Sequence, residues 1–251
     1  MKIIIKDTAA EASAAVTEIL LQQIGAKPDS ILGLPTGGTP LPVYARLREE
    51  FEKGHGSCRS ITTFNLDEYI GLSSDDPASY ARYMRENLFE HVDIDYSRTN
   101  IPNGWASDAD AEAKRYEVLI ASSGGIDLML LGLGRNAHIG FNEPGSAHDS
   151  KTRRVALTES TLAANAAYFA PGVTQPTHAI TMGIGTILEC RRIVVLATGF
   201  EKAQAVAASV NGVASEAVPG SALSHHPNTT IVLDRAAARD LGIAQPVELR
   251  A

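Results

Sequence analysis

The stretch ILGLPTGGTPLPVYARLREEF, residues 31–51, joins a short apolar run to a glycine-rich turn and then to a periodic segment. Ile31 to Leu34 is apolar throughout, as expected of a strand that is covered on both faces of a sheet. After the turn, Pro40 suits a helix start, and apolar residues recur every four positions on one face from Val43 to Phe51. A strand followed by a helix is the repeating unit of α/β folds.

The same alternation of apolar runs and amphipathic stretches continues along the chain. Thr8 to Glu11 matches a capping box, and apolar residues at helical spacing follow it as far as Gly25. The apolar runs that predict strands are Lys2–Ile5, Ile31–Leu34, Ile61–Asn65, Ile126–Leu131, Ile193–Ala197 and Thr230–Leu233. Since the sequence contains neither an internal repeat nor a linker, we expect one domain over residues 1–251. It should be a doubly wound, Rossmann-like, mostly parallel sheet with helices on both faces.

The composition limits the kinds of molecule that the protein is expected to bind. Hydrophobic residues make up 44% of the 251 residues and charged residues 20%, as in ordinary globular proteins. With 22 Lys and Arg against 29 Asp and Glu, the net charge of −7 disfavours binding to nucleic acid or to an anionic membrane, but leaves a small anionic substrate open. Cys58 and Cys190 are too few for a disulfide framework and lack metal-ligand spacing. Because no signal-like or membrane-length apolar run occurs either, we expect reduced thiols and a cytoplasmic protein.

The turn after the run at 31–34 is the first candidate binding loop, because ligands of open α/β sheets bind beyond the carboxyl ends of the strands. Adjacent Gly37 and Gly38 let the backbone approach an anion, and N–H groups at the following helix start favour phosphate. The turn lacks the Gly-Lys-Ser/Thr ending of a Walker loop. A glycine pair entering a helix is equally compatible with plain turn chemistry.

Two further loops carry acid–base residues. In FNLDEYIGL, residues 64–72, an apolar strand runs into Asp67, which suits a general base, a helix cap or a solvated turn. In GLGRNAHIGFNEP, residues 132–144, His138 and Glu143 lie five apart, and a nearby carboxylate would orient the imidazole and raise its pKa. A loop histidine can also be merely structural. The histidines form no H-E-x-x-H or Cys/His pattern, so we expect no metal site.

Taken together, the segments LPTGGTP (34–40), FNLDEYIGL (64–72) and HIGFNEPG (138–145) resemble the glucosamine-6-phosphate deaminase family. The resemblance extends to residues 73–80, 101–104, 179–187 and 199–203, and so spans nearly the whole chain. It implies conversion of glucosamine 6-phosphate and water to fructose 6-phosphate and ammonia, without metal or redox cofactor.

The resemblance also implies roles for single residues. His138 would open the sugar ring while Glu143 holds and tunes the imidazole. Asp67, expected to be ionised at neutral pH, would carry a proton from C2 to C1 through an enolamine. The phosphate would lie against the turn Thr36, Gly37, Gly38 and Thr39 and against Lys202, which stands at the start of a predicted helix.

Two positions depart from the family pattern. Asn136 stands where some members have an aspartate that relays charge to the histidine. Asn136 can hydrogen-bond the ring, but we expect His138 to depend on Glu143 for its orientation. Ala167 stands where the family usually has a phosphate-binding arginine, so Arg153, Arg154 or Arg135 would have to substitute.

Several alternatives stay open. A 6-phosphogluconolactonase has a related glycine-rich histidine loop, although the FNEP ending favours the deaminase. A galactosamine-6-phosphate deaminase differs by one hydroxyl that no motif reports. A non-catalytic sugar-phosphate sensor would have no need of Asp67, His138 and Glu143 together. Family members range from monomers to hexamers, so a homo-oligomer is also possible.

Overall fold

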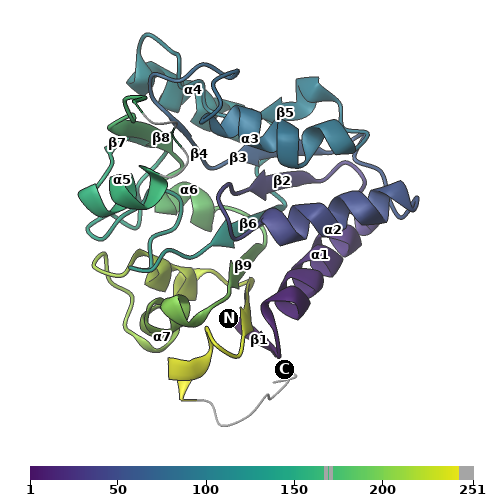
Figure 1. The fold of residues 1–251 in the computed structure, drawn as a ribbon, viewed down its shortest axis with the longest axis vertical. Helices are drawn as coiled ribbons and strands as arrows, with labels where there is room; N and C mark the ends of the chain where they lie inside the picture. The colour runs from purple at the N-terminus through teal and green to yellow at the C-terminus, as the bar shows by residue number, and fades with distance from the viewer. Residues whose placement is uncertain (167–168, 170–171, 243–251) are drawn as a thin grey trace.

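A seven-stranded parallel sheet forms the centre of the computed structural model, which describes residues 1–166, 169 and 172–242 (Figure 1). In sheet order its strands are β1 (Lys2–Lys6), β10 (Thr229–Asp234), β9 (Ile193–Ala197), β6 (Leu128–Gly132), β2 (Ile31–Leu34), β3 (Thr62–Asn65) and β5 (Thr99–Asn100). Every neighbouring pair is parallel. The six predicted strands are confirmed, with small shifts at their ends.

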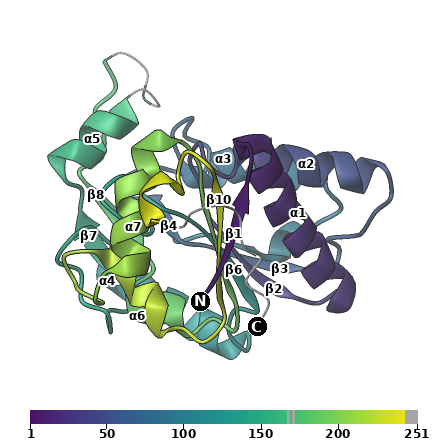
Figure 2. The ribbon, with the colours of Figure 1, turned by 90° about the horizontal axis from the view of Figure 1, so that it is seen from below.

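Helices cover both faces of this sheet, as Figure 2 shows. One face carries α1 (Ala9–Ala26), α2 (Leu41–Glu52) and α3 (Tyr80–Asn87), and the other carries α4 (Ala109–Ser122), α6 (Ile184–Leu188) and α7 (Ala203–Asn211). Successive strand residues point to opposite faces, so Leu128 and Leu130 pack with the first group whereas Met129 and Leu131 pack with the second. The doubly wound α/β fold is therefore confirmed.

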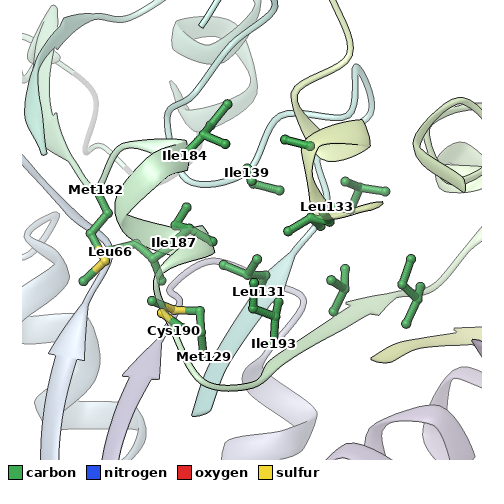
Figure 3. Close-up of a cluster of buried hydrophobic side chains, with 14 of the residues drawn as sticks. Leu66, Met129, Leu131, Leu133, Ile139, Met182, Ile184, Ile187, Cys190 and Ile193 are labelled. Atoms are coloured by element: carbon green, nitrogen blue, oxygen red, sulfur yellow. The ribbon is translucent and has the colours of Figure 1, made fainter. Parts of the chain in front are cut away.

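The core under α6 illustrates this packing. Figure 3 shows side chains of β6 and β9 together with residues of α6, among them Met129, Leu131, Ile193, Ile184 and Ile187. Each of these five side chains is almost fully buried.

The predicted capping box at the start of α1 is confirmed. The Glu11 backbone N–H donates to Thr8 Oγ1 at 3.2 Å, and the Thr8 N–H donates to Glu11 Oε2 at 3.0 Å. Short 3₁₀ helices at Phe89–His91, Tyr96–Arg98, Phe200–Lys202, Pro219–His225 and Arg239–Leu241 complete the connections.

A second, antiparallel sheet is a feature that the apolar pattern did not predict. It consists of β4 (Asp67–Tyr69), β8 (His178–Thr181) and β7 (Arg153–Ala156), with Asp67 paired to Thr181. The chain leaves the parallel sheet at Leu66, whose carbonyl accepts a hydrogen bond from Met182 N–H at 2.7 Å. Asp67 therefore begins a new strand and does not lie in a solvated turn.

The order of the strands reverses beside the first glycine-rich turn. From β2 the chain continues outward to β3 and β5, and then returns to β6 on the other side of β2 before moving outward through β9 and β10. Connections after β2 and β6 therefore run in opposite directions. In open α/β sheets ligands bind in the crevice expected at such a reversal, outside the carboxyl ends of the strands.

Both cysteines lie buried as free thiols, as expected. Burial raises the pKa of Cys58 and of Cys190 to about 12, so both stay protonated. Within the described part of the chain, no helix combines the length and the apolar character needed to cross a membrane.

A substitution at Gly104 would test how closely the loop before α4 packs against β4. A Cβ at this position would lie 2.0 Å from the Tyr69 carbonyl oxygen. We expect Gly104→Ala to lower the free energy of unfolding by about 1–3 kcal/mol, because backbone must move. Gly25 in α1 is the matched control, since nothing lies within 4 Å of its Cβ position and Gly25→Ala should stabilise by about 0.5–1 kcal/mol. Urea unfolding of both variants is the measurement, and equal effects would contradict the prediction.

Candidate active site

The predicted site residues come together at the carboxyl ends of four neighbouring strands. Thr36 to Thr39 follow β2, Asp67 lies two residues after β3, and the loop with His138 follows β6. Lys202 follows β9. A Cβ at Gly132, the last residue of β6, would lie 3.8 Å from Thr39 Cβ, so the loops after β2 and β6 adjoin.

The glycine-rich turn presents free backbone N–H groups. Gly37 has φ +92°, a conformation that glycine adopts at little cost, and its carbonyl oxygen accepts from Tyr83 Oη at 2.6 Å. Tyr44 Oη donates to the Pro35 carbonyl, also at 2.6 Å. The N–H groups of Thr36 to Thr39 donate to no acceptor among the described residues. They are therefore available to an anion.

The loop after β6 folds tightly around the His138 ring. The Gly134 N–H donates to the His138 carbonyl at 2.9 Å, and the Ala137 N–H donates to the Gly134 carbonyl at 3.0 Å. Ala137 has φ +65°, unusual for a residue with a Cβ, and its carbonyl accepts from Gly220 N–H at 2.8 Å. A Cβ on Gly134 would lie 2.3–2.4 Å from three ring atoms of His138. Gly134 thus makes room for the ring, a constraint that the sequence motif did not reveal.

Asn136 links His138 to Glu143. Asn136 Nδ2 donates to Glu143 Oε2 at 2.6 Å, and Asn136 Oδ1 lies 2.7 Å from His138 Nδ1. The carboxylate can only accept, so the Asn136 amide presents its oxygen to the ring, and an amide oxygen also only accepts. His138 Nδ1 therefore carries the hydrogen, which leaves the lone pair on Nε2.

This arrangement corrects one prediction and confirms another. Asn136 does hydrogen-bond the ring, as expected. Glu143 Oε1 lies 3.6 Å from His138 Nδ1, however, which is too long for a hydrogen bond. Glu143 therefore orients the ring chiefly through Asn136, because the Asn136 side-chain amide contacts both the Glu143 carboxylate and the imidazole.

The Glu143 carboxylate is held by the start of α5 (Glu159–Asn165), which sequence reasoning missed. Its side chain is 13% exposed, and Oε1 accepts a short hydrogen bond from Thr161 Oγ1. Partial burial raises the pKa of Glu143, but His138, Thr161 and Asn136 outweigh this and lower it to about 2. Glu143 is therefore ionised at any working pH. Thr161 lies 18 residues from Glu143, so no local motif joins them.

Asp67 is 5% exposed, and its protonation differs from the prediction. Burial, and secondarily the charge of Glu68, raises the pKa of Asp67 to about 8. Most of the Asp67 carboxyl groups are therefore protonated at pH 7, whereas we expected them to be ionised. The reason is the second sheet, which moves the carboxyl out of water.

The backbone between His138 and Glu143 passes directly over Asp67. Gly140 has φ +57°, and a Cβ there would lie 3.4 Å from Asp67 Oδ2 and 2.9 Å from Thr181 Oγ1. Phe141 N–H donates to Thr181 Oγ1 at 3.1 Å and so attaches the loop to β8. The loop that carries His138 therefore lies against the Asp67 carboxyl.

The side chain of Glu68 is engaged in hydrogen bonds with the backbone. Its carboxylate accepts from the N–H groups of Tyr69, Tyr80 and Ala81 at 2.8, 3.0 and 2.9 Å. Burial raises the pKa of Glu68 to about 7, although these three bonds oppose the rise. Glu68 therefore attaches β4 to the start of α3.

Two cations, Lys202 and Arg135, follow the neighbouring strands β9 and β6. Lys202, half-buried at the start of α7, has a lowered pKa because of burial; Glu201 opposes the shift, and the charge of Arg135 adds to it. Neither Lys202 nor Arg135 forms an ion pair with any described residue. The pair is therefore available to an anionic ligand.

The other candidate arginines differ from Arg135. Arg153 donates to Asn142 Oδ1 at 2.8 Å and to Ser146 Oγ at 3.2 Å, so its guanidinium is already engaged. Arg154 is exposed on β7. Ala167 lies outside the described residues.

Among the residues that are described, no group of three or more His, Cys, Asp or Glu side chains could hold a metal ion.

Known proteins resemble this chain over most of its length. A family model described as glucosamine-6-phosphate isomerases/6-phosphogluconolactonase matches residues 5–232. A glucosamine-6-phosphate deaminase of Rhodopirellula baltica is 54% identical over 227 residues, 90% of this chain and 90% of the relative. One from Geobacillus sp. is 48% identical over 235 residues, 94% of each chain.

Solved structures of known proteins also resemble this chain. A monomeric glucosamine-6-phosphate deaminase, described as the missing link of the NagB superfamily, is 48% identical with a TM-score of 0.93, covering 96% of this chain and 100% of that one. A 6-phosphogluconolactonase from Trypanosoma cruzi has a TM-score of 0.75 at 23% identity, covering 96% of this chain and 97% of that one, a likeness of fold alone. Because the family model matches most of the chain and the relatives are about half identical to it, the chain belongs to the glucosamine-6-phosphate isomerase/6-phosphogluconolactonase family.

Proposed function

We propose that this enzyme converts glucosamine 6-phosphate and water to fructose 6-phosphate and ammonia. One observation carries the proposal: the loop of His138, whose imidazole is bound by Asn136, lies against the buried carboxyl of Asp67 at the strand-order reversal, where a Cβ at Gly140 would be 3.4 Å from Asp67 Oδ2. The deaminases that are about half identical support the choice of substrate. The reaction needs two proton carriers and an anion site, and the crevice offers both.

The phosphate would lie at the mouth of the crevice. The N–H groups of Thr36, Gly37, Gly38 and Thr39 have no acceptor among the described residues, and a phosphate oxygen would supply one. Lys202 and Arg135 would neutralise its charge. Since Arg153 is engaged with Asn142 and Ser146, we assign the substitution for the usual arginine to Arg135.

His138 would open the sugar ring. Its Nε2 lone pair takes the proton from the C1 hydroxyl, the C1–O5 bond breaks, and the proton passes to O5, which leaves the open aldehyde. During this transfer the imidazolium is stabilised by the Asn136 amide oxygen and, more remotely, by the Glu143 charge. Asn136 also keeps the reactive lone pair on Nε2.

Asp67 would then move hydrogen between neighbouring carbons. The carboxylate takes the C2 proton, the electrons of the C2–H bond form a C1–C2 double bond, and the carbonyl oxygen O1 takes a proton from the C2 ammonium, which gives an enolamine. The proton held by Asp67 then passes to C1 and leaves a protonated imine at C2. Water adds to that imine, ammonia leaves, and fructose 6-phosphate remains. The substrate ammonium on C2 would favour the ionised form of Asp67 on binding, because an adjacent positive charge lowers a carboxyl pKa.

We also propose a cellular location and an oligomeric state for this protein. The two buried free thiols agree with the cytoplasmic location that we propose. The homologous deaminase described as monomeric supports a monomer as the simplest state, and a homo-oligomer stays the alternative.

Ammonia release is the test of the proposed function. We expect release from glucosamine 6-phosphate, and a loss of about 10²–10⁴-fold in kcat for Asp67→Asn, because the general base is removed. Galactosamine 6-phosphate and 6-phosphogluconolactone are the comparison substrates. Saturable sugar-phosphate binding without ammonia release would identify a sensor and overturn the proposal.

The burial of Asp67 should make the stability of the protein depend on pH. Because the pKa of Asp67 is raised from 3.8 to about 8 on folding, the folded protein retains a proton that the unfolded chain has lost, and stability falls as pH rises between these values. Asp67→Asn cannot ionise, so its Tm should gain on that of the wild type as pH rises from about 5 to about 9. Calorimetry at several pH values measures this difference. A constant Tm difference across that range would contradict the assignment.

Arg135 should matter for binding rather than for chemistry. We expect Arg135→Ala to raise the KM for glucosamine 6-phosphate about tenfold with little change in kcat, because a charge-assisted contact to phosphate is lost. Arg154→Ala is the matched control, an exposed arginine on β7 that should leave KM unchanged. Steady-state kinetics decide between them, and an equal effect of the two substitutions would exclude a specific role for Arg135.

A further inference from the structure

The first turn of α5 is built against the Glu143 carboxylate. Thr161 is 7% exposed, and its hydroxyl donates to Glu143 Oε1. Thr158 caps the helix by accepting from the Thr161 N–H at 3.2 Å, and Thr158 Oγ1 in turn donates to Thr161 Oγ1 at 3.1 Å. The Thr161 hydroxyl hydrogen is thereby directed at the carboxylate, which can only accept it.

Two short hydrogen bonds therefore fix the rotation of Glu143, and Thr158 Oγ1 lies at the longer distance of 3.5 Å from Oε1. Oε1 accepts from Thr161, and Oε2 accepts from Asn136 at 2.6 Å. With both oxygens engaged, the carboxylate keeps its distance of 3.6 Å from His138 Nδ1 and continues to hold the Asn136 amide. If the Thr161 hydroxyl were absent, Oε1 would keep only the 3.5 Å contact with Thr158 Oγ1, so the carboxylate could rotate and the amide that sets the ring tautomer would lose its fixed partner.

The position of α5 does not depend on Glu143 alone. At the other end of the helix, Asn165 Nδ2 donates to Tyr69 Oη at 2.9 Å, and Tyr69 is the last residue of the strand that begins with Asp67. Leu162 packs in the cluster that contains Tyr69 and Phe141. The helix is thus anchored to the Asp67 strand and presents Thr161 to Glu143 from a fixed place.

We infer that Thr161 is a positioning residue of this enzyme, which holds the Glu143 carboxylate so that Asn136 keeps His138 oriented with its Nε2 lone pair free. The inference rests on the proposed function for its kinetic consequence, but the geometry stands without it. Among the hydrogen bonds of the residues that the structure describes, none joins Thr161 to His138 or to Asp67. Its effect on the reaction would pass through Glu143 and Asn136.

Thr161→Val is the decisive variant, because valine keeps the branched shape and removes only the hydroxyl. We expect kcat to fall about tenfold, the effect of losing one hydrogen bond to an ionised group, whereas KM should change less than about twofold. Thr161→Ser, which restores a hydroxyl, should recover most of the wild-type kcat. The readout is ammonia release from glucosamine 6-phosphate.

Thr186→Val is the matched control for a generally loosened fold. Thr186 is also buried, and its hydroxyl donates to the Glu117 carboxylate at 2.7 Å, away from the crevice. This variant should lose stability but keep the wild-type kcat. A spectroscopic measurement accompanies the kinetics: the ¹H–¹⁵N resonance of His138 Nδ1–H, identified by its absence in His138→Gln, should move in Thr161→Val and stay in place in Thr161→Ser and Thr186→Val.

The outcomes separate the two proposals. A wild-type kcat and an unmoved His138 resonance in Thr161→Val would overturn the positioning role, and so would an equal loss of kcat in Thr186→Val. If the wild-type protein released no ammonia, the proposed function would be wrong. The His138 resonance would then still test Thr161, since that measurement needs no substrate.

Discussion

The parallel pairing of β2 with β6 is the constraint on which the rest of the molecule depends. Leu32 pairs with Leu128 and Gly33 with Met129, and at this seam the chain reverses its direction across the sheet. A Cβ at Gly33 would lie 2.3 Å from Met129 Sδ, so the missing side chain leaves room for the methionine that fills one face of the core. The seam brings the turn after β2 beside the histidine loop after β6, and the crevice follows from that adjacency.

The antiparallel sheet determines the environment of Asp67 in the candidate site. By pairing Asp67 with Thr181 it withdraws a carboxyl from water, and the resulting rise in pKa to about 8 makes the group receptive to a proton near neutral pH. Glu68, the next residue, points away and holds the start of α3 through three backbone N–H groups. Adjacent carboxyl groups on one strand thus have separate uses, because successive side chains face opposite sides.

A chain of polar contacts sets the state of the imidazole. It runs from Thr161 to Glu143, from Glu143 to Asn136 and from Asn136 to His138, and each donor has one acceptor that can only accept. An asparagine in this chain transmits orientation but carries no charge, so the negative charge stays on Glu143, 3.6 Å from the ring. The site therefore separates the orientation of the imidazole from the stabilisation of its charged form.

The sequence by itself determined the parallel sheet and the loops that bear the candidate site. Fully apolar strands, the capping box at Thr8 and the turn at Gly37 are local features, because neighbouring residues decide them. Tertiary structure alone decided the protonation of Asp67, the contact of Thr161 with Glu143 and the effect of the Arg135 charge on the pKa of Lys202. Each of these depends on segments distant in sequence, and desolvation and charge act through space, so no local pattern records them.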